Sequence, residues 1–134
     1  MATHTGTAKA RFGVTREEHR DLFTVLDEYA LAHCVARDLR RSRGIASEFQ
    51  RLFGQVDELK RQGGRVGQVL ELRSDRILNY LISKEKSYQK PTYRTVWEAL
   101  LDLREKLLSA NVLKLASPKL ACKRDGLDWS SGTC

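Results

Sequence analysis

The sequence predicts a single α/β domain built on a largely parallel β-sheet, and three observations support this fold class. The chain has 134 residues, which is the length of one domain. Its hydrophobic fraction of 41% and charged fraction of 31% are typical of a folded protein with a core. Short apolar runs alternate with amphipathic helical patterns, which favours parallel strands connected by helices.

The first third of the chain gives conflicting signals. Residues 1–10 are small and polar, so we expect a flexible leader followed by one domain over residues 11–134. Thr15-Arg-Glu-Glu18 has the pattern of a capping box and predicts a helix. Residues 29–36 form a nearly continuous apolar run, which is also typical of a buried parallel strand. The pattern alone leaves helix and strand open here.

The middle of the chain predicts a helix and two strands. Ser47-x-x-Gln50 predicts the start of an amphipathic helix that ends at Gly63-Gly64. The apolar face of this helix consists of Phe49, Leu52, Phe53, Val56 and Leu59. Residues 66–72 and 77–83 are rich in Val, Ile, Leu and Tyr, and they flank a Ser74-Asp75 turn. They are expected to be adjacent strands, with a hairpin as one arrangement.

A second long helix follows a polar segment. Pro91 bars a helix through Lys90, and Thr92 is expected to open a helix that ends near Asn111. The core-facing residues of this helix are Val96, Leu100, Leu103 and Leu107. Residues 112–116 predict a short strand, and residues 117–134 show no clear period.

Charge gives the first indication of a ligand class. Lys and Arg total 24 against 17 acidic residues, so the formal net charge is +7 and favours phosphate-bearing or polyanionic partners. No run approaches the roughly 20 apolar residues of a membrane-spanning helix, and the N-terminus lacks a secretory signal. The three cysteines include no Cys-x-x-Cys pair, which disfavours a disulfide framework and a zinc cluster. We therefore expect an intracellular protein without a membrane partner.

Three polar, basic loops follow predicted strands. They span residues 37–44, 84–91 and 117–128. Ligands of parallel sheets bind in loops at the carboxyl ends of the strands, so these loops predict a site for a phosphorylated ligand. His33 lies within an apolar run and is expected to be a buried core histidine.

Several short motifs together resemble a known family. They are Asp21-Leu-Phe23, Leu31-Ala-His-Cys34, Gly44-Ile-Ala46, Phe53-Gly54, Tyr80-Leu-Ile-Ser-Lys84, Lys90-Pro-Thr-Tyr93, and Pro118 followed by Cys122 and Asp125. In this order and at this spacing the chain resembles the macrodomains of the terminal ADP-ribose protein glycohydrolase type, also described as O-acetyl-ADP-ribose deacetylases. The resemblance spans about residues 21–129.

The resemblance implies a three-layer α/β/α fold with a mixed, largely parallel sheet, whose strand-end loops bind ADP-ribose. Lys84 matches the family lysine that attacks the distal ribose and displaces a glutamate side chain of the modified protein. Asp125 matches the aspartate that assists release of the lysine-bound ADP-ribose, and Asp21 matches the one that reads the adenine amino group. The other expected ligand-binding residues are Leu22, Arg43, Gly44, Ile45, Ser83, Pro118, Lys123 and Arg124.

The resemblance also fixes further expectations. Residues 31–35 are expected to be a core strand, which resolves the ambiguity left by the local pattern. The expected partners are ADP-ribose and ADP-ribosylated proteins, without a cofactor or a metal ion. The expected location is nuclear or cytoplasmic.

Two loops and the C-terminus depart from the family pattern. The family's Met-Gly-Ala-Gly-Ile-Ala reads Arg41-Ser-Arg-Gly-Ile-Ala46 here, and its Gly-Cys-Gly-Leu-Asp reads Ala121-Cys-Lys-Arg-Asp125. Loop glycines allow backbone N–H groups to approach phosphate, so Arg43 either supplies charge in their place or obstructs the site; we expect obstruction. Relatives continue through another helix and strand after the region of Trp129, and we expect this chain to lack both.

Three functions therefore follow from the sequence. The first is an ADP-ribose-binding macrodomain that hydrolyses ADP-ribosyl-glutamate esters and O-acyl-ADP-ribose. The second is an ADP-ribose reader without catalysis, because both altered loops lie at the expected site. The third, of another class, is a basic nucleic-acid-binding protein. Aromatic residues are only 7% of the chain and lie mostly in apolar stripes, which disfavours the base-stacking surface that the third function requires.

Overall fold

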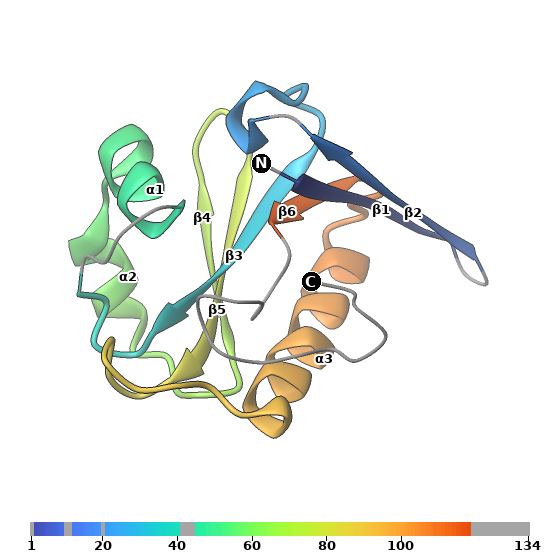
Figure 1. The fold of residues 1–134 in the computed structure, drawn as a ribbon. Helices are drawn as coiled ribbons and strands as arrows, with labels where there is room; N and C mark the ends of the chain where they lie inside the picture. The colour runs from blue at the N-terminus through green and yellow to red at the C-terminus, as the bar shows by residue number, and fades with distance from the viewer. Residues whose placement is uncertain (1, 10–11, 20, 41–44, 119–134) are drawn as a thin grey trace.

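The computed structural model describes residues 2–9, 12–19, 21–40 and 45–118, which form a mixed sheet flanked by helices (Figure 1). The strands are β1 (Ala2–Lys9), β2 (Phe12–His19), β3 (Ala30–Ala36), β4 (Val69–Arg73), β5 (Ile77–Lys84) and β6 (Leu115–Pro118). The helices are the 3₁₀ turn η1 (Leu22–Thr24), α1 (Ile45–Phe53), α2 (Val56–Gln62) and α3 (Tyr93–Ser109). The strand order is β2-β1-β6-β3-β5-β4.

The sheet has a parallel centre and antiparallel edges. β3 pairs in parallel with β5 on one side and with β6 on the other. The pairs β1–β2, β1–β6 and β4–β5 are antiparallel. The sheet is mixed, as expected, but antiparallel pairs outnumber parallel pairs among the described strands, so it is not largely parallel. A short turn such as the one between β4 and β5 joins antiparallel strands only. The hairpin expected around Ser74-Asp75 is confirmed.

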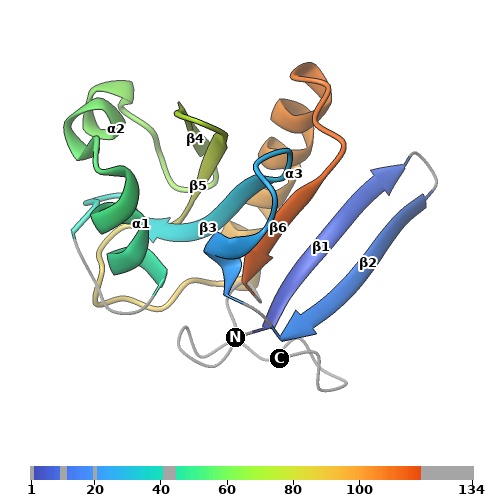
Figure 2. The same ribbon diagram turned by 90° about the horizontal axis from the view of Figure 1, so that it is seen from above.

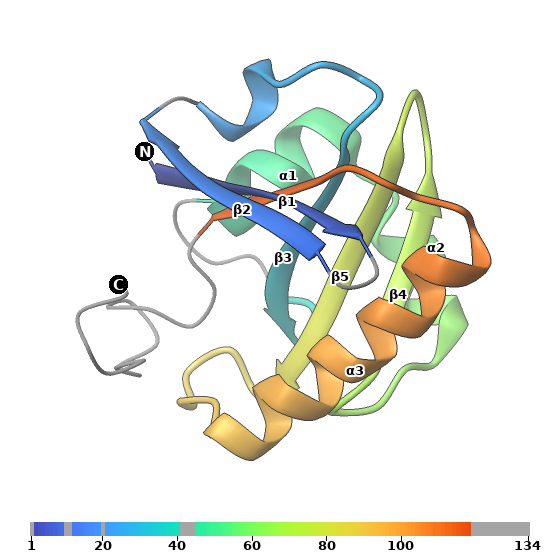
Figure 3. The same ribbon diagram turned by 90° about the vertical axis from the view of Figure 1, so that its right-hand side faces the viewer.

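The helices cover the two faces of the sheet and so form three layers. α1 and α2 lie on one face, and α3 crosses β4 and β5 on the other (Figures 1 and 3). Successive residues of a strand point to opposite faces, so Leu31 packs in the core beneath α1 and α2 while Ala32 packs beneath α3. The first core includes Phe49 and Leu59, and the second includes Ala99 and Leu103. This arrangement confirms the expected three-layer α/β/α fold.

The segments that were ambiguous or expected to be flexible are strands. Residues 30–36 form β3, as the family resemblance implies, and their apolar run reflects a central strand covered on both faces. The capping-box pattern of Thr15–Glu18 lies within β2. Residues 2–9, expected to be a leader, form β1, which pairs with β2 and β6 (Figure 2). The backbone pairing of β1 with β2 and β6 makes this small, polar segment a strand, although its sequence has no hydrophobic alternation.

The helix expected from Ser47 to Gly63 is two helices. α1 begins at Ile45, before Ser47, and ends at Phe53. Gly54 and Gln55 both have a φ of 59°, in the left-handed region, and a residue in that conformation cannot continue a right-handed helix. α2 then ends at Gly63, which has a φ of 64°. The break turns the chain so that Phe49 of α1 and Leu59 of α2 both reach the same core.

The second long helix begins at its expected cap, but the strand after it starts later than expected. The Thr92 side chain accepts a hydrogen bond from the Thr95 backbone N–H. At the other end, Asn111 has a φ of 56° and the Val112 N–H donates to the Leu107 carbonyl, at 2.9 Å. This is the Schellman arrangement that closes a helix. Val112 therefore belongs to the helix end, and β6 begins at Leu115 rather than at residue 112.

In the part of the chain that the structure describes, no helix has the length and apolar character needed to cross a membrane.

Replacing Gln55 by Gly is expected to stabilise the protein. Gln55 has no side-chain capping bond, and a left-handed conformation costs a residue with a Cβ about 1–2 kcal/mol. The greater chain entropy of an unfolded glycine offsets part of this gain, so the free energy of unfolding should rise by about 0.5–1 kcal/mol in urea denaturation. Gln55→Ala is the control, because it keeps the strained conformation and should give no gain. Equal stabilities of the Gly and Ala variants would contradict the assignment.

Candidate functional site

The carboxyl ends of β3, β5 and β6 point in the same direction, because the three strands are parallel. β3 ends at Ala36 and β5 at Lys84, and these two residues lie opposite each other, so Ser83 and Lys84 lie at the carboxyl end of the β3–β5 pair. β6 pairs with the first two residues of β3 and ends at Pro118, before β3 reaches its own end. The expectation that the site residues meet at one end of the sheet holds for Ser83 and Lys84, whereas Pro118 lies nearer the middle of β3.

Lys84 follows an irregularity in the β3–β5 pairing. Val35 lies opposite Ile82, but Ala36 lies opposite Lys84, so Ser83 has no partner residue in β3. A bulge of this kind leaves one residue unpaired and redirects the strand, and bulges are common beside functional sites. Lys84 is half-buried at the end of this bulge.

The loops that follow β3 and β5 are fastened to one another. The Arg37 N–H donates to the Lys84 carbonyl at 2.7 Å, and the Asp38 N–H donates to the Glu85 carbonyl at 3.2 Å. The Asp38 carboxylate accepts hydrogen bonds from the N–H groups of Ser87 and Arg40. The β3–β5 pairing thus continues as paired loops, and this continuation holds the backbone around Lys84.

The charge next to Lys84 is partly matched by Arg37. The Glu85 carboxylate lies 3.2 Å from Nη1 of Arg37, and both side chains are about half exposed. Nε of Arg37 also donates to the Gly64 carbonyl at 3.2 Å, which ties the loop after α2 to the same cluster. The acidic neighbour of Lys84 is therefore directed towards an arginine on the adjacent loop.

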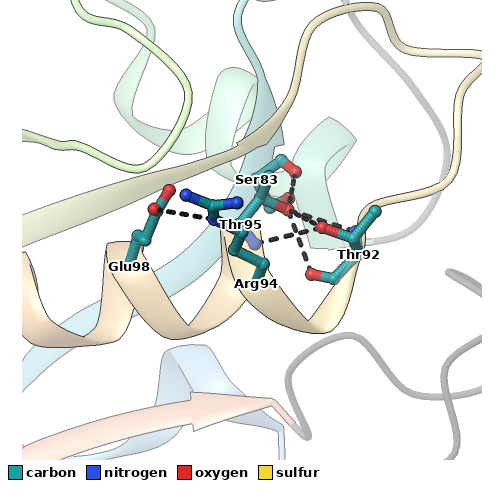
Figure 4. Close-up of polar contacts among 5 residues, drawn as sticks. All are labelled: Ser83, Thr92, Arg94, Thr95 and Glu98. Atoms are coloured by element: carbon teal, nitrogen blue, oxygen red, sulfur yellow. Dashed lines mark hydrogen bonds and ion pairs between the residues drawn. The ribbon is translucent and has the colours of Figure 1, made fainter.

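Ser83 is buried at the face that α3 covers. Its side chain is 1% exposed and its hydroxyl has no hydrogen-bond partner, while its carbonyl accepts a hydrogen bond from Oγ1 of Thr95 at 2.7 Å (Figure 4). This burial was not expected of a ligand-binding residue. Contact between Ser83 and a ligand stays a prediction.

Asp21 and Leu22 lie on the turn that follows β2. The exposed Asp21 accepts the Phe23 N–H at 3.0 Å through Oδ1 and so caps η1. Leu22 is completely buried in the core, so the structure assigns its side chain to packing. The largely buried side chain of Arg76 donates to the Val25 carbonyl at 2.9 Å and pairs with Asp27, which fixes the loop after η1. The Asp21 carboxylate is thus presented to solvent on an anchored turn.

The other predicted site residues are less completely placed. Ile45 is the first residue of α1. Arg43, Gly44, Lys123, Arg124 and Asp125 lie outside the described residues, and so do both loops that depart from the family pattern. Their roles stay predictions.

His33 is a core residue, as its apolar surroundings predict. Its ring stacks on Phe49 with centroids 3.8 Å apart and meets the edge of Tyr80 at 4.9 Å. Burial lowers the pKa of His33 to about 3 and raises the pKa of Tyr80 to about 12, since both charged forms would lose hydration. Nε2 of His33 has no hydrogen-bond partner, so His33 is a neutral ring in an aromatic cluster.

Among the described residues, no group of three His, Cys, Asp or Glu side chains is arranged to hold a metal ion. A groove of about 380 Å³ lies between β4 and the C-terminal half of α3, lined by Glu71, Arg73, Asp102, Glu105, Lys106, Ser109 and Ala110. The groove contains none of the predicted site residues.

Sequence comparison decides the family. No protein-family model matches the chain. The chain is 37% identical over 112 residues to human ADP-ribose glycohydrolase OARD1, covering 83% of this chain and 74% of that protein. It is 36% identical to the Bos taurus ADP-ribose glycohydrolase OARD1 over the same coverage. The chain belongs to the OARD1 family of macrodomains. A third relative is the uncharacterised protein 032R of invertebrate iridescent virus 6, 41% identical over 66 residues, or 49% of this chain and 66% of that protein.

Solved macrodomains share the fold of this OARD1-type chain. The macrodomain of Mycobacterium tuberculosis DarG superposes with a TM-score of 0.75 at 21% identity, covering 84% of this chain and 80% of that one. Thermosipho africanus DarTG, solved in complex with ADP-ribose, gives a TM-score of 0.71 at 19% identity over 87% of this chain and 35% of that one. These likenesses confirm the macrodomain fold.

The structure also reveals residues around the candidate site that the sequence did not indicate. Arg37, Asp38 and Thr95 hold the backbone around Lys84, and Arg76 anchors the turn that carries Asp21. Thr92 and Thr95 form a capping box in the structure, and the Thr92-x-x-Thr95 spacing, with Thr in place of the usual Glu or Gln, is the only sequence signal for Thr95. The pairing of Thr95 with Ser83 has no sequence signal, because the two residues are brought together only by packing of α3 on the sheet.

Replacing His33 by Leu is expected to flatten the dependence of stability on pH. The folded pKa of His33 is about 3 and its ordinary value is 6.5, so between these values the unfolded chain binds more protons. Stability should therefore fall as the pH is lowered from 6.5, by at most about 1.4 kcal/mol per pH unit from this residue. Urea denaturation at pH 7 and pH 4 should show that His33→Leu loses about 2–3 kcal/mol less than the unmodified chain. An unchanged pH dependence would show that another group is responsible.

Proposed function

We propose that this chain binds ADP-ribose and hydrolyses ADP-ribosyl-glutamate esters, with Lys84 as the nucleophile. The observation that carries the proposal is the placement of Lys84. It stands at the carboxyl end of β5, beside the carboxyl end of the parallel strand β3, on backbone held by the loop after β3. Ligands of open α/β sheets bind at such edges.

The relatives support the ligand and the reaction class. The curated relatives from human and Bos taurus are named ADP-ribose glycohydrolases, and one structural relative was solved with ADP-ribose. Asp21 is exposed on an anchored turn, as an aspartate that reads the adenine amino group must be. The net charge of +7 favours an anionic ligand, and ADP-ribose carries a diphosphate.

The reaction proposed for Lys84 is a displacement at the anomeric carbon of the distal ribose. The neutral Nζ forms a bond to this carbon, and the bond from the carbon to the ester oxygen of the glutamate breaks. The glutamate leaves as a carboxylate with the bonding electron pair, and the nitrogen gives up one proton to solvent water. Asp125 then accepts a proton from a second water, whose oxygen bonds to the anomeric carbon as the carbon–nitrogen bond breaks; the nitrogen takes back a proton, so free ADP-ribose leaves and the amine is regenerated.

The same proposal extends to the partners of the protein. The substrates are ADP-ribosylated proteins, with O-acyl-ADP-ribose as a second substrate class, and the site of action is the nucleus or cytoplasm. Arg43, Lys123 and Arg124 replace or adjoin the altered glycines of the family loops, so they decide whether the chain turns over or only binds.

The chain is expected to bind free ADP-ribose in isothermal titration calorimetry. Asp21→Asn should weaken binding by about tenfold, because the amide keeps an acceptor for Phe23 but presents an N–H₂ group in place of a carboxylate oxygen. Raising salt from 50 to 200 mM should weaken binding by about tenfold or less, since only one diphosphate is bound, whereas a nucleic-acid backbone would lose far more. No heat at millimolar ADP-ribose would refute the proposal.

Turnover is expected to require Lys84. Lys84→Ala should abolish ADP-ribose release from a glutamate-linked peptide and leave the Kd for free ADP-ribose within about threefold, because only the reacting group is removed. Lys86→Ala is the matched control, since it removes an exposed lysine from the same loop and should retain activity.

The covalent step is tested with a second variant. Asp125→Ala should accumulate a protein species heavier by one ADP-ribosyl unit, detected by mass spectrometry. Unimpaired hydrolysis by Lys84→Ala would exclude the lysine mechanism. Binding without any turnover by the unmodified chain would instead identify an ADP-ribose reader.

A further inference from the structure

The carbonyl groups on either side of the Lys84 side chain each accept a hydrogen bond from another element. The carbonyl of Ser83, before Lys84, accepts Oγ1–H of Thr95 at 2.7 Å. The carbonyl of Lys84 itself accepts the Arg37 N–H, also at 2.7 Å. The orientation of both peptide planes fixes the direction in which the Lys84 side chain leaves the backbone.

The hydrogen bond from Thr95 reaches the Ser83 carbonyl at the bulge in the β3–β5 pairing. No residue of β3 lies opposite Ser83 in this pairing. Ser83 is also buried, and a buried carbonyl left without a donor costs free energy. Thr95 supplies the donor from another element, α3, which packs on the sheet through Val96, Ala99 and Leu103.

The hydroxyl of Thr95 both donates and accepts hydrogen bonds (Figure 4). It lies 2.7 Å from the Ser83 carbonyl and 3.0 Å from the Thr92 carbonyl, and its single proton goes to the nearer acceptor, Ser83. Its oxygen accepts the Thr92 N–H at 3.1 Å and lies 3.2 Å from Oγ1 of Thr92. The Thr95 N–H donates separately to Oγ1 of Thr92. One hydroxyl therefore links the start of α3 to the peptide group before Lys84.

We propose that Thr95 is a positioning residue for Lys84. The bond to the Lys84 carbonyl comes from the backbone N–H of Arg37, whereas the bond to the Ser83 carbonyl comes from the side chain of Thr95, so a substitution at Thr95 removes it. The inference rests on the proposed function, in which Nζ of Lys84 must meet the anomeric carbon. A misplacement of about 1 Å at a reacting atom can lower a rate about a hundredfold.

The decisive comparison is Thr95→Val against Thr92→Val. Thr95→Val keeps the side-chain shape but removes the bond to the Ser83 carbonyl. Thr92→Val removes the acceptor for the Thr95 N–H, yet keeps the Thr92 N–H and the bond from Thr95 to Ser83. Both variants damage the helix cap, so a merely structural role predicts similar losses of Tm and of activity in both.

Thr95→Val is expected to lower the single-turnover rate of ADP-ribose release by about tenfold or more, with the Kd for free ADP-ribose within about twofold. Thr92→Val should lower Tm similarly and keep the rate within about threefold. Thr95→Ser, which restores the hydroxyl, should recover the rate. Equal rates in the two valine variants, or no recovery in Thr95→Ser, would overturn the proposal.

Amide hydrogen exchange separates failure of this inference from failure of the proposed function. In the unliganded protein, Thr95→Val should speed exchange over residues 82–86 by about tenfold relative to Thr92→Val, because the peptide group before Lys84 is released. If the unmodified chain shows no turnover, or if Lys84→Ala turns over normally, the proposed function fails. The exchange difference then still decides whether Thr95 holds this backbone, and unchanged exchange overturns that role.

Discussion

The parallel pairing of β3 with β5 is the interaction on which the rest of the structure depends. It places Cys34 opposite Leu81 in the centre of the sheet, and it continues past the strand ends through the bonds of Arg37 and Asp38 to the next loop. A slip of one residue would turn each side chain of a strand to the opposite face, so that Leu31 would leave the core beneath α1 and α2 and Ala32 would take its place. The register that buries the core therefore also fixes where Lys84 stands.

At the end of the sheet where Lys84 lies, polar groups form hydrogen bonds with neighbouring helices and loops as well as with the paired strand. The bulge leaves Ser83 without a partner in β3, and Thr95 of α3 provides one. Asp38 accepts N–H groups from two loop residues, and Arg37 reaches both Gly64 and Glu85. Buried or partly buried polar groups are costly when unpaired, so this network gives the loops around Lys84 one favoured arrangement. A site that must place a reacting nitrogen benefits from such support.

Much of the fold was predictable because the spacing of hydrophobic residues within a single segment indicates whether that segment is a helix or a strand. The β4–β5 hairpin, the cap at Thr92 and the burial of Val96 and Leu103 follow from local patterns. Other features were decided by backbone conformation and pairing. The left-handed residues Gly54 and Gln55 divide the expected helix, and β1 is a strand because β2 and β6 pair with it. Neither the left-handed conformation of Gln55 nor the pairing of a polar strand such as β1 produces a periodic pattern of hydrophobic residues in the sequence.

The sequence by itself determined the family and the identity of the central candidate, since Tyr80-Leu-Ile-Ser-Lys84 and Lys90-Pro-Thr-Tyr93 are contiguous motifs. It also predicted that Lys84 would stand at the end of a strand. Only the tertiary structure decided that Leu22 and Ser83 are buried and that Thr95 and Arg37 hold the peptide groups on either side of Lys84. The physical reason is that these contacts join residues from different strands, helices and loops, and such residues become neighbours only when the sheet and α3 have packed together.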